Sequence, residues 1–425
     1  MKVLLVVYDN DSYANWFPQG LGYIAAILKK NGICVKIYNQ DIHHYSEEHL
    51  TEYLDNEKFD VVGLSVIAGY YQYRKLLKIS NAINRSKNRP FYVIGGHGPA
   101  PEPEFFLNRT QADAVIIGEG EETVVELLDA VKDHKTLQGI KGIAFRDGNN
   151  VTVNDRRPLI KDIDSIPFPA YELFPVHIYR LLRMPNSVSN DLVMPVLSGR
   201  GCTFRCTFCY RMDKGFRPRS NESIMEEIIL LKQKYGVTYI VFSDELLMSS
   251  IERVERLCAD FIKNNLNVKW SCNGRLNYAK REILKLMKKA GCVFINYGIE
   301  AMDDDVLKNM QKNLTVTQIT KGIEATLSAG VSPGFNIIFG NIGDTKESLK
   351  KGVEFLLEYD DGSQMRTIRP VTPYPGCPLY YDAIKKGLIK DCEDFYENKH
   401  ANSCSRCFAR RRSPNLGKRV HGLRQ

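Results

Sequence analysis

The chain has 425 residues, of which 44% are hydrophobic and 25% are charged, values that are typical of a globular protein with two or three domains. Its net charge is +8, but residues 400–425 hold seven Lys or Arg and no acid, which leaves +1 (8 − 7) for the rest. A basic balance confined to a short tail argues against nucleic-acid binding. The sequence has no signal-peptide core and no apolar run near ~18 residues, so we expect a cytoplasmic protein whose 11 cysteines are thiols or metal ligands.

The first 145 residues alternate between apolar runs of strand length and segments with helical spacing. We expect strands at 2–8, 35–39, 60–67 and 90–98, helices at 21–32 and 70–86, and a strand–turn–helix unit within 112–133. This order predicts a doubly wound, Rossmann-like parallel sheet. Ligands of such sheets bind beyond the carboxyl ends of the strands. Neither a G-x-G-x-x-G loop nor a phosphate-binding P-loop is present, so the pattern leaves open whether the ligand is flat or phosphate-bearing.

A hairpin around Asp147–Gly148 and a segment with four prolines within 155–175 separate this domain from the next. We therefore expect a domain over 1–145, a Pro-rich linker over 146–190, a second domain over 191–376 and a C-terminal segment over 377–425.

The second domain is a further alternating series. Expected strands are 192–199, 237–244, 268–274, 292–300, 332–340 and 365–373. Expected helices are 221–235, 250–265, 279–290, 303–311, 315–330 and 345–359. Six βα units without a turn-back predict a partial (β/α)6 barrel, in which chemistry is carried by the loops at the C-terminal ends of the strands.

Three cysteines, Cys202, Cys206 and Cys209, follow the first of these strands in the stretch SGRGCTFRCTFCYR. A closed zinc site would need a fourth ligand, and a C-x-x-C redox pair would leave Cys202 unexplained. Interleaved arginines argue against a buried cluster of free thiols. A [4Fe–4S] cube held by three thiolates keeps one iron open for an external ligand, and we favour this interpretation.

The C-x3-C-x2-C motif at the end of the first strand of a partial barrel resembles the radical S-adenosylmethionine (SAM) superfamily. Later segments resemble that family in the same order: VFSDELL (241–247), CNGRL (272–276), NYGIEA (296–301), GFNIIFGNIGDT (334–345) and PYPGCPLY (373–380). The resemblance implies that SAM chelates the open iron and is cleaved by one electron to a 5′-deoxyadenosyl radical. The SAM contacts that it implies are Phe208, Ser243, Asp244, Glu245, Arg275 and Glu300.

The front domain is similar to the cobalamin-binding module that often precedes this barrel. The segments VVGLSVIAGYY, VIGGHGPAPEPE and VIIGEGEETVVELL carry this likeness, and together the resemblance covers about residues 1–390. The cobalamin contacts that it implies are Ser65, Gly95, Gly96, Gly118 and Glu119.

Two histidines near these segments have open roles. Some cobalamin modules ligate cobalt through D-x-H-x-x-G, but here the sequence is DIHHYS, with Ser in place of Gly and after the second strand instead of the first. We therefore expect His43 to be a surface residue and cobalamin to bind without it. His97 fits equally a residue that points at the cofactor and a satisfied turn residue.

The tail departs from the family. Cys404-x2-Cys407, even with Cys392, does not complete a metal site, so we expect a disordered or truncated end.

The leading functional hypothesis is a cobalamin-dependent radical SAM methyltransferase that acts on an unactivated carbon, is oxygen-sensitive, takes a small-molecule or peptide substrate, and receives electrons from a flavodoxin or ferredoxin. The alternatives are a cyclase or rearrangement enzyme similar to an oxygen-independent tetrapyrrole ring cyclase, and a non-catalytic corrinoid-binding relic.

Overall fold

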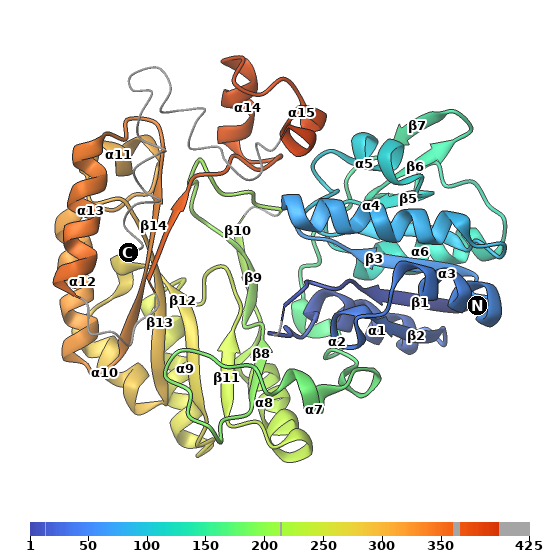
Figure 1. The fold of residues 1–425 in the computed structure, drawn as a ribbon. Coiled ribbons are helices and arrows are strands. Elements are labelled where there is room, and N and C mark those ends of the chain that lie inside the picture. The colour runs from blue at the N-terminus through green and yellow to red at the C-terminus, as the bar shows by residue number, and fades with distance from the viewer. Residues whose placement is uncertain (13, 213–214, 360–365, 399–425) are drawn as a thin grey trace. The chain divides into compact units, whose positions relative to one another are not determined.

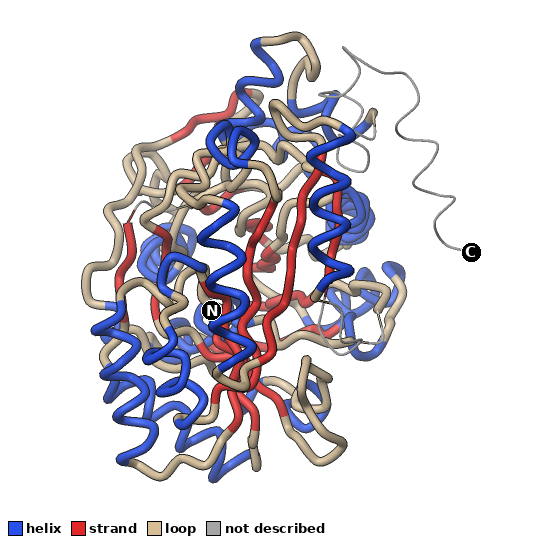
Figure 2. Tube along the Cα trace, turned by 90° about the vertical axis from the view of Figure 1, so that its left-hand side faces the viewer, coloured by secondary structure: helices blue, strands red, loops and turns tan. Residues whose placement is uncertain are grey.

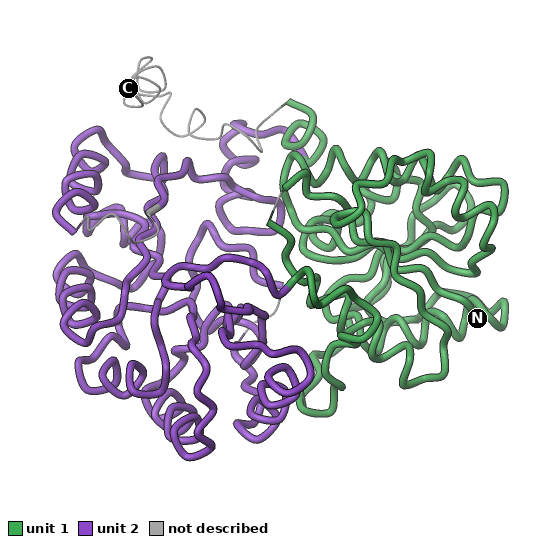
Figure 3. Tube along the Cα trace, turned by 60° about the horizontal axis from the view of Figure 1, so that its bottom comes forward, with its two compact units in different colours: residues 1–179, 392–398 green, residues 180–391, 399–425 purple. Residues whose placement is uncertain are grey.

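The computed structural model describes residues 1–398 apart from 13, 213–214 and 360–365. The described chain forms two compact units, Met1–Tyr179 with Cys392–Asn398, and Arg180–Asp391 (Figure 3). The predicted basic tail, with Cys404 and Cys407, lies outside the described residues. Within the described part, no helix combines the length and the apolar character needed to cross a membrane.

The first unit is built on a seven-stranded sheet with the order β2-β1-β3-β4-β5-β6-β7. The strands are β1 (Lys2–Val7), β2 (Cys34–Asn39), β3 (Val61–Ser65), β4 (Phe91–Gly95), β5 (Ala114–Ile116), β6 (Ile143–Asp147) and β7 (Asn150–Val153). The first five are parallel, and the β6–β7 hairpin adds two antiparallel strands at one edge. Val3 to Val7 are all buried, as expected for a parallel strand covered on both faces.

Helices cover both faces of this sheet (Figure 1). They are α1 (Gln19–Lys30), α2 (Gln40–His43), α3 (Glu47–Glu57), α4 (Tyr70–Arg85), α5 (Pro103–Thr110) and α6 (Glu121–Lys132). Helix α1 packs beside α6, and α4 packs beside both α3 and α5. The doubly wound prediction is therefore confirmed, and α2, α3 and α5 are additional helices that the apolar pattern did not predict.

The Pro-rich segment that the sequence suggests is a linker folds against the first unit. It forms two 3₁₀ turns (Ile163–Ser165 and Tyr171–Leu173) and the short helix α7 (Val176–Tyr179). The ring of Phe17 lies 5.1 Å from that of Tyr171 and 5.1 Å from that of Phe174. Aromatic packing of this kind buries enough apolar area to hold a segment that lacks helical periodicity.

The second unit is built on a six-stranded parallel sheet with the order β15-β14-β13-β12-β11-β8. The strands are β8 (Val193–Val196), β11 (Tyr239–Phe242), β12 (Lys269–Gly274), β13 (Cys292–Glu300), β14 (Ser332–Phe339) and β15 (Arg366–Pro370). Each lies within two or three residues of its predicted position. The sequential order of the strands confirms the partial (β/α)6 barrel.

The helices of this unit lie on the outer face of the curved sheet (Figure 2). They are α8 (Asn221–Tyr235), α9 (Ile251–Lys263), α10 (Arg281–Lys289), α11 (Asp304–Asn309), α12 (Val316–Ser328) and α13 (Lys346–Glu358). Helix α14 (Pro378–Lys385) follows β15 and lies apart from this layer, at the top of Figure 1. The last helix, α15 (Cys392–Glu397), belongs to the first unit. Local signals fix many helix starts: Thr315 and Gln318 form a capping box at α12.

Candidate functional site

The three cysteines do not follow the first barrel strand directly. After β8 the chain forms a small antiparallel hairpin of β9 (Gly199–Cys202) and β10 (Gly215–Pro218), in which Cys202 pairs with Gly215. Cys202 thus ends a strand, whereas Cys206 and Cys209 lie on the loop that follows. We name residues 203–212 the cysteine loop.

Backbone contacts from two other regions hold the cysteine loop. The Thr207 amide donates to the Met310 carbonyl at 3.0 Å, and the Thr207 carbonyl accepts from the Leu379 amide at 2.9 Å. Leu379 belongs to the PYPGCPLY segment, one of those that resemble the radical SAM superfamily. The loop is therefore held by the β13–α12 connection on one side and by α14 on the other.

Two buried cations lie against the same loop. The Arg275 guanidinium stacks 3.4 Å from the centre of the Phe204 ring, and its Nη1 lies 3.7 Å from Cys206 Sγ. Its Nη2 donates to the Lys312 carbonyl. Lys312 Nζ lies 2.7 Å from Glu300 Oε1 and 5.7 Å from the Phe208 ring centre.

This environment favours the thiolate at one cysteine in particular. The pKa of Cys206 falls to about 6, first because the Cys209 thiol donates a hydrogen bond to it and further because of the Lys312 and Arg275 charges. The pKa of Cys209 is raised, since it is the donor in that pair and is buried. Burial also raises the pKa of Cys202, and the nearby Glu245 carboxylate adds to the increase. The site therefore holds its negative charge near Cys206, where the two cations are.

The donor set fits an iron–sulfur cube better than a single ion. Among the described residues, no three His, Cys, Asp or Glu side chains converge closely enough to bind one metal ion. A structural zinc site is closed by four protein ligands, whereas the β9–β10 hairpin supplies three thiols. In a [4Fe–4S] cube each thiolate binds a different iron, so three cysteines on one hairpin suffice and one iron stays open.

Some of the predicted SAM residues lie against the cysteine loop, and the others lie after the end of β11. Phe208, Arg275 and Glu300 lie at the cysteine loop through the contacts given above, and Glu245 is exposed near Cys202. Ser243 follows β11, with its amide 3.1 Å from the Val196 carbonyl.

Asp244 lies in a buried hydrogen-bond network. Its carboxylate is 1% exposed and accepts hydrogen bonds from the Ser198 amide at 2.6 Å and from the Ser198 hydroxyl. Arg253 donates to the Ser198 carbonyl at 2.7 Å. Burial raises the pKa of Asp244 to about 6, against these hydrogen bonds and the Arg253 charge. In this structure Asp244 ties β11 to the turn between β8 and β9.

Two features of this site carry no signal that predicts them from the sequence. Lys312 lies in no motif, and its ion pair with Glu300 joins residues that only the fold brings together. Side chains on neighbouring strands also form a polar ladder: Asn296 donates to Asn273 at 3.1 Å, Asn336 to Asn296 at 2.7 Å, and Thr367 to Asn336 at 2.6 Å. Asn273, Asn296 and Asn336 lie within the quoted segments CNGRL, NYGIEA and GFNIIFGNIGDT, whereas Thr367 lies in none of them.

The first unit has its own candidate ligand edge. Its first five strands have the order 2-1-3-4-5, and such sheets bind ligands at the switch point between β1 and β3. Ser65 ends β3 opposite Gly95, which ends β4, and Gly118 follows β5. These three predicted cobalamin contacts therefore lie on the same C-terminal edge.

Glycine is required at this edge because the loops after β3 and β4 touch. Gly96 has a φ of +94°, and a Cβ on it would lie 2.6 Å from the Val66 carbonyl oxygen and 2.9 Å from the Ser65 hydroxyl. Gly118, at φ +90°, has open space around it. An edge of bare backbone next to open space fits a large, flat cofactor that must approach closely. Glu119, by contrast, uses its carboxylate to accept the Ile160 amide at 2.8 Å.

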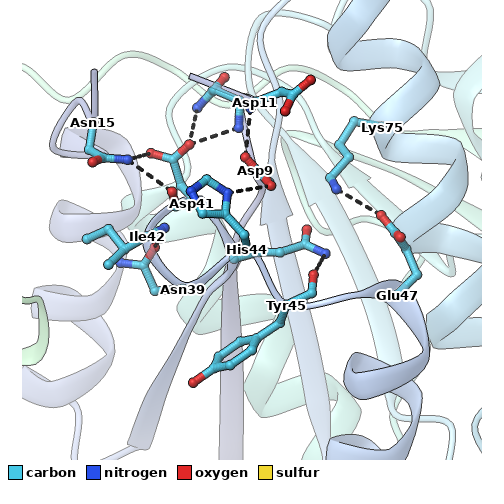
Figure 4. Close-up of polar contacts among 12 residues, drawn as sticks. Asp9, Asp11, Asn15, Asn39, Asp41, Ile42, His44, Tyr45, Glu47 and Lys75 are labelled. Carbon is cyan, nitrogen blue, oxygen red and sulfur yellow. Dashed lines mark hydrogen bonds and ion pairs between the residues drawn. The ribbon is translucent and has the colours of Figure 1, made fainter. Parts of the chain in front are cut away.

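In the DIHHYS segment the buried side chain is that of Asp41, whereas its two histidines are exposed (Figure 4). Asp41 is 1% exposed, and its carboxylate accepts the Asn10 amide at 2.8 Å and Asn15 Nδ2 at 3.0 Å. His44 lies 2.9 Å from Asp9. His43 is exposed and stacks on Tyr45 at 5.0 Å between ring centres. The segment therefore holds the loop after β1, and His43 lies on the surface.

Comparison with known proteins gives the same division of the chain. Residues 5–128 match the model of the B12 binding domain, and residues 196–356 match that of the Radical SAM superfamily. An uncharacterised methyltransferase of Pyrococcus horikoshii is 28% identical over 400 residues, covering 92% of this chain and 84% of its own. The anaerobic magnesium-protoporphyrin IX monomethyl ester cyclase of Cereibacter sphaeroides is 28% identical over 382 residues, covering 87% of this chain and 60% of its own.

A solved structure has the same fold. The radical S-adenosylmethionine methyltransferase TsrM from Kitasatospora setae, solved with cobalamin and a [4Fe-4S] cluster, superposes with a TM-score of 0.75 at 18% identity. The match covers 91% of this chain and 75% of TsrM.

A partial barrel with three cysteines on one hairpin, together with a Rossmann-like sheet, defines a radical SAM enzyme with a second cofactor module. The chain belongs to the cobalamin-dependent radical SAM family, in which a B12-binding domain precedes the radical SAM domain. Its cofactors are a [4Fe–4S] cluster, SAM and cobalamin.

Proposed function

We propose that this enzyme is a methyltransferase that transfers a methyl group from cobalamin to an unactivated carbon of a small molecule or peptide. The observation that carries the proposal is the presence, in one chain, of a thiol triad with buried cationic support and a cobalamin-binding domain. The methyltransferases of Pyrococcus and Kitasatospora named above support the reaction type.

The two cofactors supply the chemistry when bound: the reduced cluster cleaves SAM to a hydrogen-abstracting radical, and methylcobalamin supplies the methyl group. The chain's own residues bind and orient these groups. We assign Cys202, Cys206 and Cys209 to three irons, and Phe208, Arg275, Glu245 and Glu300 to the surroundings of SAM. Ser65, Gly95, Gly96 and Gly118 are the proposed cobalamin edge. A flavodoxin or ferredoxin is the expected electron donor.

The test needs no knowledge of the substrate. Protein reconstituted with iron, sulfide and cobalamin is incubated anaerobically with a reductant and SAM that is deuterated on its methyl group. Methyl transfer predicts S-adenosylhomocysteine and deuterated methylcobalamin, both detected by mass spectrometry. Cobalamin that stays unmethylated while SAM is cleaved to 5′-deoxyadenosine would contradict the proposal.

The second candidate is a cyclase or rearrangement enzyme, favoured by the 28% identity to the magnesium-protoporphyrin cyclase. It predicts 5′-deoxyadenosine without methylated cobalamin, so the same experiment separates the two candidates.

A further inference from the structure

Lys312 occupies a position where a lysine is unexpected. It is 6% exposed, and charged side chains are almost never buried unless they are paired. Its partner is Glu300, which is 7% exposed, at 2.7 Å between Nζ and Oε1. A buried ion pair is weak evidence for stability, because the desolvation of two charges offsets most of their attraction. The pair therefore calls for a role other than stabilisation.

The backbone is shaped to accommodate this pair. Glu300 has a φ of +68°, a left-handed conformation that is uncommon for a residue with a side chain, and it follows an irregularity in the β13–β14 register. Two residues earlier, Gly298 leaves the space that the pair fills: a Cβ there would lie 2.2 Å from Glu300 Oε1 and 2.8 Å from Lys312 Nζ. Strain of this kind persists where the surrounding structure imposes it, often at functional sites.

The pair faces the cysteine loop. Lys312 Nζ lies 5.7 Å from the ring centre of Phe208. Phe208 lies between Cys206 and Cys209 in the sequence. The Lys312 carbonyl accepts from Arg275, whose Nη1 lies 3.7 Å from Cys206 Sγ. Among the described residues, the Lys312–Glu300 pair and Arg275 thus place charges next to the cysteine loop.

We propose that Lys312, held in position by Glu300, is a positioning residue that raises the reduction potential of the cluster bound at Cys206 and Cys209. The proposal rests on the cluster assignment made under Proposed function. Reduction adds one electron to the cube, from the 2+ to the 1+ state, with no bond made or broken. A nearby positive charge stabilises the added electron, and a nearby negative charge opposes it. In a water-poor site these charges are poorly screened.

The test is a redox titration of the reconstituted, SAM-free protein, with dithionite as electron source and the reduced cluster followed by electron paramagnetic resonance. Three variants are compared with the unaltered chain: Lys312→Met, Glu300→Gln and Lys308→Met. Lys308 is an exposed lysine on α11, close to the same connection, and is the matched control. We expect a lower potential for Lys312→Met, a higher one for Glu300→Gln, and no shift for Lys308→Met.

The opposite signs separate charge from structure. A loop that was merely distorted would move both potentials in the same direction or reduce iron content, and either result would overturn the proposal. Lys312→Arg keeps the positive charge and should therefore keep the reduction potential of the cluster. This variant provides the test if Lys312→Met does not fold. Unaltered protein that binds no iron would overturn the cluster assignment itself. An intact cluster with unshifted potentials would overturn only the role of Lys312, whatever reaction the enzyme performs.

Discussion

At the C-terminal edge of the barrel sheet, charged side chains converge on the cysteine loop, whereas at the same edge of the first sheet the charged side chains hold loops and bare glycine backbone faces outward. Arg275 and Lys312 lie beside Cys206 and Phe208 in the barrel. In the first unit, Asp41 instead binds the loop after β1.

The difference matches the two kinds of cofactor. A cube with three thiolates carries excess negative charge. Because water is excluded from a buried site, nearby cationic side chains must compensate this charge. A corrin ring is large and flat, so its site needs open space and close backbone approach, which glycine provides. The C-terminal edge of the barrel sheet thus carries charged side chains, whereas the C-terminal edge of the first sheet presents glycine backbone.

The largest expected effect comes from the thiol triad. Cys206→Ala should abolish cluster binding and SAM cleavage, because two thiolates cannot hold the cube stably on one loop. The measurement is iron content after anaerobic reconstitution, with 5′-deoxyadenosine production. Cys34→Ala, at an exposed cysteine on β2, is the control and should change neither. Iron retained in Cys206→Ala would contradict the assignment of the cluster to the three cysteines of the barrel unit.

A substitution of Gly96, at the C-terminal edge of the first sheet, tests the proposed cobalamin site. Gly96→Val should lose cobalamin binding and about 1–3 kcal/mol of folding stability, because the new side chain meets the Val66 carbonyl and φ is +94°. Cobalt retained after desalting and thermal unfolding report the two effects. Gly32→Ala is the control, because Gly32 also has a left-handed φ (+72°) and open space around it but lies between α1 and the start of β2, so this variant should keep its cobalt. Equal cobalt retention in both variants would show that close approach at Gly96 is unimportant.

The Asp244 network predicts a pH dependence of stability. The pKa of Asp244 is about 6 in the folded protein and about 3.9 when unfolded, so between these values the folded state binds more protons. The stability from this group therefore falls as pH rises from about 4 to about 6, by about 3 kcal/mol in all. Denaturant unfolding of the unaltered chain and Asp244→Asn should show the advantage of Asp shrinking across this window. An advantage that grows with pH would contradict the buried environment of Asp244.

His43→Ala is expected to have the smallest effect. His43 is exposed and stacks on Tyr45, so its loss should change stability by less than about 0.5 kcal/mol and leave the cobalamin spectrum unchanged. Loss of cobalt, or a changed spectrum of the bound cofactor, would show that the first sheet uses a side-chain ligand after all.

The sequence predicted what local periodicity encodes. All six barrel strands and their helices were found, since their apolar patterns alternate without interruption, and the three cysteines stood out by spacing alone. The β9–β10 hairpin was missed because four-residue strands rich in glycine and arginine carry no strand signal. Lys312 was missed because only the fold brings it next to Glu300, and the hydrogen bonds between Asp244 and Ser198 are likewise invisible in the sequence.

The most direct test of the account is a count of metals in one chain. Protein reconstituted anaerobically with iron, sulfide and hydroxocobalamin should retain about four irons and one cobalt after desalting, with the cobalt lost in Gly96→Val and the iron lost in Cys206→Ala. Iron without cobalt in the unaltered chain would contradict the central claim that its two sheets are specialised for two cofactors.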